Sequence, residues 1–397
     1  MLKVTFAQMG NSYIPLRTLL CELGLEPVIP PPTSQKTIET GTKLSPEFAC
    51  FPLKVNIGNY LEAIAAGAEF ILMAGGVGPC RFGYYGELQR EILKDAGYDI
   101  EFLILEAPKT HPLELFQKIR RFLPRHQPHD LIRAGYMAWL KAEALDCFDR
   151  WANRIRPRET VIGETTRVQN CFYQALDQAT LVRDIKKIRG EGLGQLQAIA
   201  VRPDRIPLKI MLVGEIFMVL EPRVNFQMER LLGENGVAVE RTIYFSDWVY
   251  EQLFLSIVKP DWRRKYHLAA QPYLENFIGG HGVETVAHTV SASVNGYHGV
   301  IELAPFTCMP EIVAMQALTT ATQELPLAVL PLIIDEHSAA TGIQTRVEAF
   351  VDLLERRRCL IQNQEKPQGN LPLVPEMTPR ESLRRENEKE ERICSSI

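Results

Sequence analysis

The sequence predicts an α/β protein in which two parallel-sheet domains are separated by a helical segment. Three observations lead to this prediction. Strands alternate with helices over residues 2–105, strand-forming patterns are scarce over residues 112–200, and the alternation returns near residue 207. Alternating strands and helices are typical of a mostly parallel sheet that is covered by helices on both faces.

The first predicted domain, residues 1–111, opens with a β-branched and apolar strand over residues 2–8 (LKVTFAQ). A helix over residues 13–24 ends at Gly24, because glycine readily adopts the backbone conformation that closes a helix. The remaining elements are expected as a short extended segment at 27–30, a helix over 53–66, a strand over 69–73, a helix over 85–96 and a strand over 99–105.

The middle of the chain, residues 112–205, is predicted to be a helical insertion or linker domain. Long amphipathic runs such as DLIRAGYMAWLKAEALDCFDRWANRI fill it. Their apolar residues recur at helical spacing and not with the period of two that a strand requires.

The second predicted α/β domain spans residues 206–360 and repeats the layout of the first, although no clean sequence repeat is visible. Strands are expected at KIMLVGEIF, VAVERTIYF, HGVIELAPF and LAVLPLIID, and helices at 222–234, 246–257, 263–278, 283–293, 310–322 and 341–358. The fold prediction is therefore two Rossmann-like domains. The charged segment 361–397 is expected to be a disordered tail.

Composition excludes several classes of protein. The chain has 397 residues, of which 46% are hydrophobic and 23% charged, and its net charge is −4. A nucleic-acid partner would require a basic excess, so none is expected. A membrane partner is not expected either, because no apolar run of about 18 residues is present. The start MLKVTFAQM is typical of a core strand and not of a signal peptide, so we expect a cytoplasmic protein.

Three of the eight cysteines share a local pattern. Cys50, Cys80 and Cys308 all lie in predicted loops next to or near proline. Cys80 and Cys308 each follow a predicted strand and precede a helix, which is the edge of an α/β sheet where ligands bind. The other five cysteines lie in helical patterns, at a helix end or in the tail, and we interpret them as packing or surface residues.

Thiolates in such loops are typical metal ligands. Backbone N–H groups and helix N-termini stabilise a thiolate, and Gly75, Gly76 and Gly78 would let backbone amides approach a bound cluster. Iron–sulfur clusters are held by cysteine thiolates. From the residues alone, isolated structural cysteines, a catalytic thiol and a three-cysteine zinc site remain open alternatives.

Longer motifs resemble a known family. The segments MGNSY, SPEFACFPLKVNIGNYLEAIAAGAEFILMAGGVGPCRFGYYGELQREIL, VGEIFMVLEPRVN, GGHGVET, GVIELAPFTCMPEIV and IIDEHSAATGIQTRVEAFVDLLE occur in this order. They are similar to the 2-hydroxyacyl-CoA dehydratase superfamily, in the branch of acyl-CoA dehydratase activase-related proteins, also called CoA protein activases. The resemblance covers about residues 1–360.

The resemblance implies one [4Fe–4S] cluster on Cys50, Cys80 and Cys308, in a cleft between the two α/β domains, with the fourth iron position open. It also implies a separate ATP-dependent activator that supplies a low-potential electron. The cluster would pass this electron to a small substrate of the acyl-CoA type, and a homologous cluster-bearing subunit is a further expected partner.

Departures from the family keep other functions open. The chain lacks the phosphate-binding signature of the activator kinases, so it is not expected to hydrolyse ATP itself. It also has fewer motif cysteines than related double-cubane proteins. A non-catalytic Fe–S electron relay or partner subunit is the first alternative, and a metal-free or zinc-stabilised interaction protein is the second.

Four neighbouring residues are further site candidates. Arg81 directly follows Cys80 and Gly78 lies two residues before it, and both are candidates for the surroundings of the cluster. Arg81 is expected to tune the cluster or hold an anion, with a surface ion pair as the alternative. Glu215, at a strand end, is a candidate acid–base residue. His281, in the turn Gly279-Gly280-His281-Gly282, is a candidate proton donor or a hydrogen-bonded structural residue.

Overall fold

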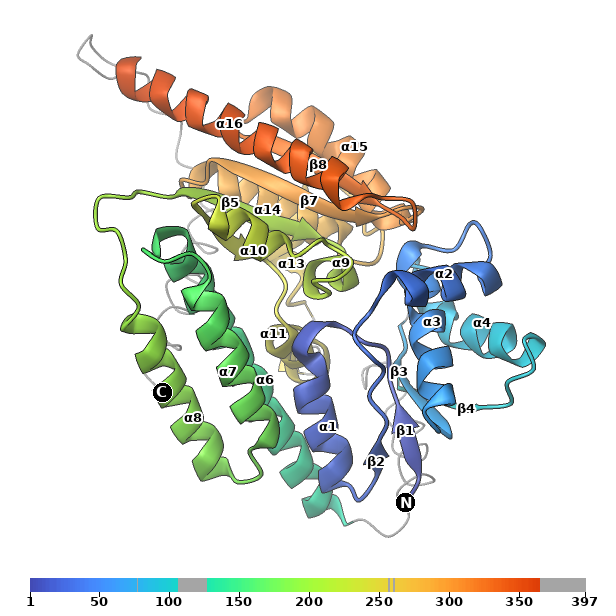
Figure 1. The fold of residues 1–397 in the computed structure, drawn as a ribbon. Coiled ribbons are helices and arrows are strands. Elements are labelled where there is room, and N and C mark those ends of the chain that lie inside the picture. The colour runs from blue at the N-terminus through green and yellow to red at the C-terminus, as the bar shows by residue number, and fades with distance from the viewer. Residues whose placement is uncertain (77, 106–126, 256–257, 260, 365–397) are drawn as a thin grey trace.

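The computed structural model describes residues 1–76, 78–105, 127–255, 258–259 and 261–364. It contains two four-stranded sheets, and every strand pair in both sheets is parallel. The α/β class and the two parallel sheets predicted from the sequence are therefore confirmed. Figure 1 shows the second sheet beneath helix α16 and the first sheet beside helices α2, α3 and α4.

The first sheet has the strand order β2-β1-β3-β4. Its central strands are short, and Val4 of β1 lies opposite Pro27 of β2 on one side and Phe70 of β3 on the other. Its elements are β1 (Lys3–Thr5), η1 (Gly10–Ser12), α1 (Tyr13–Glu22), β2 (Glu26–Pro27), α2 (Gln35–Leu44), α3 (Phe51–Ala65), β3 (Phe70–Ala74), α4 (Phe82–Asp95) and β4 (Glu101–Leu105).

Helix α2 was not predicted, because its sequence QKTIETGTKL is mostly polar. It begins with a capping box, in which the side chains of Ser34 and Thr37 bond each other's backbone N–H groups. Glycines then let it cross α3 closely. A Cβ on Gly41 would lie 1.8 Å from the Lys54 carbonyl oxygen, and a Cβ on Gly58 would lie 2.0 Å from the Thr37 carbonyl oxygen.

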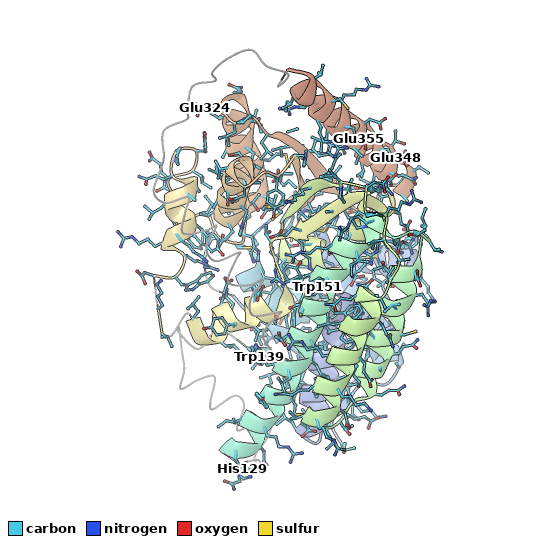
Figure 2. The ribbon with its side chains drawn as sticks, turned by 90° about the vertical axis from the view of Figure 1, so that its left-hand side faces the viewer. His129, Trp139, Trp151, Glu324, Glu348 and Glu355 are labelled. Carbon is cyan, nitrogen blue, oxygen red and sulfur yellow. The ribbon has the colours of Figure 1, made fainter. Side chains whose placement is uncertain are left out.

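Long helices occupy the middle of the chain. They are α6 (Pro128–Ile155), α7 (Glu164–Gln178) and α8 (Val182–Gln197), with the short 3₁₀ helix η2 (Arg156–Arg158) directly after α6. They share a core in which the rings of Phe148 and Phe172 stack at 4.0 Å, and Ile14 of α1 joins this core. Figure 1 shows α1 and these helices side by side, and Figure 2 shows α6 running from His129 to Trp151 near the second sheet.

The second sheet has the order β6-β5-β7-β8. In its register, Met211 of β5 lies opposite Glu240 of β6 and Val300 of β7. Its elements are β5 (Leu208–Gly214), α9 (Ile216–Leu220), α10 (Met228–Glu234), β6 (Val237–Arg241), α11 (Phe245–Tyr250), the π-helix η3 (Glu251–Leu255), α13 (Arg264–Ala270), α14 (Gly282–Val294), β7 (Gly299–Pro305), α15 (Met309–Glu324), β8 (Ala328–Ile334) and α16 (Ala340–Gln364).

Several elements of the second half differ from the prediction. Strand β6 was expected over 237–245 but ends at Arg241, and helix α9 was not expected. Strand β5 was expected to continue to residue 217, but Gly214 has φ +130° and Glu215 caps α9 with its side chain. Helix α16 extends to Gln364, into the segment expected to be tail. The rest of that segment, 365–397, and the expected domain boundary at 111/112 lie outside the described residues.

The two halves of the chain share one order of elements around the cysteines. In the first half, α3 leads into β3, Cys80 follows, and α4 and β4 come next. In the second half, α14 leads into β7, Cys308 follows, and α15 and β8 come next. Over the described ranges, each helix is too short or too polar to cross a lipid bilayer.

Candidate functional site

Each of the three predicted cysteine ligands lies at the start of a helix. Cys50 is the N-cap residue of α3, and Cys308 is the N-cap residue of α15. Cys80 immediately precedes Arg81, the N-cap residue of α4. Helices of 14 to 16 residues therefore direct their positive ends toward the three sulfur atoms.

Arg81 connects the three cysteine segments. Its Nη1 donates to the carbonyl oxygen of Phe48 at 2.7 Å, and its Nη2 donates to the carbonyl oxygen of Thr307. Phe48 lies two residues before Cys50, Thr307 directly precedes Cys308, and Arg81 itself follows Cys80. Arg81 and Thr307 are 226 positions apart in the sequence, so one side chain joins loops from distant parts of the chain.

Electrostatic effects link the Cys50 thiol to both of the other thiols. Burial, with a smaller contribution from the neighbouring Cys80, raises the pKa of the Cys50 thiol to about 12. Burial also raises the pKa of Cys80, and it raises that of Cys308, on which Cys50 acts as well. Without a cation beside them, all three thiols are therefore protonated at neutral pH.

Polar groups are already directed at the sulfur atoms. The Tyr85 hydroxyl donates to the thiol of Cys50 and accepts the backbone N–H of that residue at 3.1 Å. The N–H of Phe82 donates to the sulfur of Cys80, and the N–H of Glu311 donates to the sulfur of Cys308. Such donors favour thiolate over thiol.

The glycine-rich turn before α14 packs directly on the cysteine segments. A Cβ on Gly279 would lie 2.7 Å from the Cys80 nitrogen, and one on Gly280 would lie 3.0 Å from Pro310 Cγ. Both glycines have positive φ, +81° and +54°. Side chains are therefore excluded from this wall of the site.

The other predicted site residues, Glu215, Gly78 and His281, lie in different surroundings. Glu215 lies near the thiols, because its charge raises the pKa of all three, and burial raises its own pKa to about 7. Gly78 has φ +131° and a Cβ there would be 3.7 Å from Phe277. His281 caps α14 but faces a separate polar cavity.

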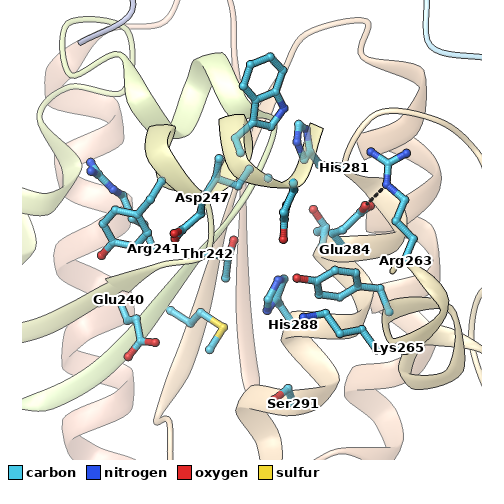
Figure 3. A pocket seen from close by; sticks show the side chains of 18 of the residues that line it. Glu240, Arg241, Thr242, Asp247, Arg263, Lys265, His281, Glu284, His288 and Ser291 are labelled. Atoms are coloured by element: carbon cyan, nitrogen blue, oxygen red, sulfur yellow. Dashed lines mark ion pairs between the residues drawn. The ribbon is translucent and has the colours of Figure 1, made fainter. Parts of the chain in front are cut away.

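That cavity, of about 90 Å³, lies between α14 and the segment 240–252 (Figure 3). Figure 3 shows His281, Glu284 and His288 on α14 facing it, with Arg263 paired to Glu284. Burial lowers the pKa of His281 to about 4, so its imidazole is neutral at pH 7. The turn 279–281 thus separates this cavity from the cysteines.

Two buried carboxyl groups were missed by the sequence reasoning. Glu302 on β7 and Glu311 on α15 both have 0% exposure. Both oxygens of Glu302 and one of Glu311 have no hydrogen-bond partner among the described residues, and Thr285 donates to the other Glu311 oxygen. A lone acidic residue inside the apolar strand GVIELAP was the available signal.

Within the parts of the chain that the structure describes, no three His, Cys, Asp or Glu side chains are grouped closely enough for one metal ion. The thiolates of a [4Fe–4S] cubane bind different iron atoms, so they can stand farther apart.

Neither a scan against protein-family models nor a search of curated proteins finds a match to this chain.

Proposed function

We propose that the chain is a [4Fe–4S] protein of the 2-hydroxyacyl-CoA dehydratase type. Cys50, Cys80 and Cys308 would hold one cluster in a cleft between the two α/β domains, with the helices α6–α8 as an insertion. The bridge that Arg81 makes between the Phe48 and Thr307 carbonyls carries this proposal, because it brings three distant cysteine loops to one place.

The chemistry of the donor set fits a cluster better than a catalytic thiol. A nucleophilic cysteine needs a lowered pKa. Burial raises the pKa of all three thiols here. A metal replaces the proton on each sulfur and removes this cost. The N–H groups of Phe82 and Glu311 and the Tyr85 hydroxyl donate hydrogen bonds to the sulfur atoms and would stabilise the thiolates.

A bound cluster would supply one-electron transfer and an open iron site for a substrate oxygen. The protein's own residues would set its environment. Arg81 and the helix N-termini offset negative charge on the sulfurs. Glu215, whose pKa is about 7, could hold a proton beside the site at neutral pH. The glycine turn leaves the wall near Cys80 free of side chains.

The electron would come from a separate ATP-dependent activator and go to a small substrate such as an acyl-CoA. A homologous cluster-bearing subunit would be a partner. The main alternative, a non-catalytic relay or partner subunit, uses the same three cysteines and differs only in whether product forms.

Anaerobic purification or reconstitution with iron and sulfide tests the cluster. We expect about four iron and four sulfide per chain and a broad absorption band in the blue region. Cys80→Ala should abolish both. Cys171→Ala, which replaces an exposed cysteine on α7, should change neither. Zinc without iron, or a cluster that survives Cys80→Ala, would refute the proposal.

Activity is tested separately by mixing the reconstituted protein with an activator, ATP and candidate acyl-CoAs. Product formation supports the dehydratase-type function. Reduction of the cluster without product from any of them supports the relay.

A further inference from the structure

The polar cavity of Figure 3, which we call the α14 cavity, has no role in the proposed function. The wall opposite α14 includes the π-helix η3, which contributes Glu251 and Gln252 to the lining. π-Helices are rare, and they occur frequently at functional sites. A water-sized group requires roughly 15 Å³ of such space, so a volume of about 90 Å³ holds about six of them. The cavity is therefore large enough for a small organic molecule.

The arginines of the α14 cavity already have acidic partners. Arg263 contacts Glu284 at 3.2 Å, and Arg150 pairs with Asp247. Arg241 pairs with three acids that lie outside the lining. The guanidinium groups therefore hold no charge in reserve for an anionic ligand.

The remaining charged groups of the lining are engaged as well. The Tyr297 hydroxyl donates to Glu240. Burial raises the pKa of Glu251 to about 8, against the opposing effect of Lys265, so the Glu251 carboxyl group is uncharged at neutral pH. Lys265 itself takes part in an interaction within the protein. A charged ligand would thus compete with contacts that the protein already makes.

Two imidazoles, in contrast, face the cavity without partners. His281 and His288 both belong to the lining, and Figure 3 shows them on the same side of α14. Burial lowers their pKa values to about 4 and about 3, so each ring is neutral and offers one N–H donor and one acceptor nitrogen. Among the described residues neither ring forms a hydrogen bond, and both rings are partly exposed, so their nitrogen atoms remain accessible.

The spacing of the two imidazoles argues against a metal ion. Seven residues of α-helix separate His281 from His288, which corresponds to a rise of about 10 Å. Two nitrogen ligands of one ion cannot stand so far apart. This agrees with the absence of a metal-binding group among the residues that the structure describes.

Aromatic side chains form much of the remaining lining. Tyr244, Trp248, Trp262 and Tyr266 contribute to it, and the ring of Tyr266 lies 5.2 Å from that of His288. Flat rings pack well against a planar molecule and gain little from a branched one.

From the neutral imidazoles, the paired charges and these aromatic walls, we propose that the α14 cavity binds a small, uncharged, planar molecule that carries both an N–H donor and a carbonyl acceptor, such as a simple amide or lactam. A charged molecule would lose its hydration without gaining a free counter-ion. The turn 279–281 separates this site from the cysteines, so the inference does not depend on a cluster.

The test uses 2-pyrrolidone, a lactam of six non-hydrogen atoms, and NMR of the full chain with ¹³C-labelled histidine rings. The signals of His281 and His288, among the eight histidines, should shift and saturate with one site per chain. Cyclopentanone has the same ring and carbonyl but no N–H group, so it should bind about tenfold more weakly. The cation pyrrolidine and the anion propionate should not bind at this site.

His288→Phe keeps a ring but removes both nitrogen atoms, and it should weaken 2-pyrrolidone binding about tenfold. His288→Gln restores a donor and an acceptor and should recover part of the affinity. The matched control is His337→Phe, which replaces an exposed histidine outside the lining, and thermal unfolding checks that each variant folds. Absence of saturable shifts, equal binding of cyclopentanone, pyrrolidine or propionate, or equal weakening by His337→Phe and His288→Phe would overturn the proposal.

Discussion

Replacing Glu302 by glutamine should make the protein less sensitive to alkaline pH. Glu302 lies on β7 with 0% exposure, and its carboxyl oxygens have no partner among the described residues. Burial raises its pKa from 4.5 to about 8. The folded state therefore holds a proton that the unfolded state releases above about pH 4.5, and folding stability falls as pH rises toward 8.

The magnitude follows from the shift. The difference between 4.5 and about 8 is about 3.5 pH units. At about 1.36 kcal/mol per unit, it corresponds to at most about 5 kcal/mol of unfolding free energy lost between pH 4.5 and pH 9. Local relaxation and water entry reduce this, so we expect about 2–4 kcal/mol.

Urea unfolding of the wild type and of Glu302→Gln, repeated from pH 5 to pH 9, measures the effect. The variant should gain stability relative to the wild type as pH rises. Glu311 is a second buried carboxyl group whose pKa is raised, first by burial and then by Glu302. Part of the pH dependence of stability should therefore remain in the Glu302→Gln variant. Glu101→Gln, which replaces the exposed carboxylate at the first position of β4, is the matched control. A constant difference between Glu302→Gln and the wild type across this range would refute the reasoning.

Three further predictions concern other contacts. Arg81→Ala removes the hydrogen bonds to Phe48 and Thr307, so the rate at which a chelator removes iron from the reconstituted cluster should rise about 30-fold, equivalent to about 2 kcal/mol. Arg81→Lys should be less affected, and unchanged iron retention in Arg81→Ala would contradict the prediction. Arg241→Met leaves the carboxylates of Asp146, Asp149 and Glu229 without their cation, and urea unfolding should show a loss of about 3–5 kcal/mol. Gly10→Ala places a Cβ against the Leu220 carbonyl at φ +54°, so the unfolding free energy should fall by about 2–4 kcal/mol, whereas Gly135→Ala in α6, where a Cβ meets nothing within 4 Å, should be tolerated.

The sequence predicted those elements whose own residues carry the signal. All eight strands were predicted near their observed positions, but β5 and β6 were drawn too long. For β5 the reason is that KIMLVGEIF is mostly apolar and only the backbone at Gly214 ends the strand. Helix α2 was missed because its stability comes from its cap and its close contact with α3, not from an apolar stripe.

The site was predictable only in part. The cysteines were identified from their loops, yet the bridging role of Arg81 was not, because it depends on two backbone carbonyls that are distant in the sequence. His281 adjoins the glycines that touch Cys80, but its side chain faces the other cavity. Sequence patterns give the neighbours of a residue along the chain and not the direction of its side chain.

The shared order of elements has a consequence for how the two halves divide their work. If a half-chain paired with a second copy of itself, symmetry would force the same residue onto both equivalent helix starts. A single polypeptide is free of that constraint. Here the start of α3 carries Cys50, whereas the start of α14 carries His281 behind two glycines that pack against Cys80 and Pro310, so one half furnishes a sulfur where the other furnishes bare backbone.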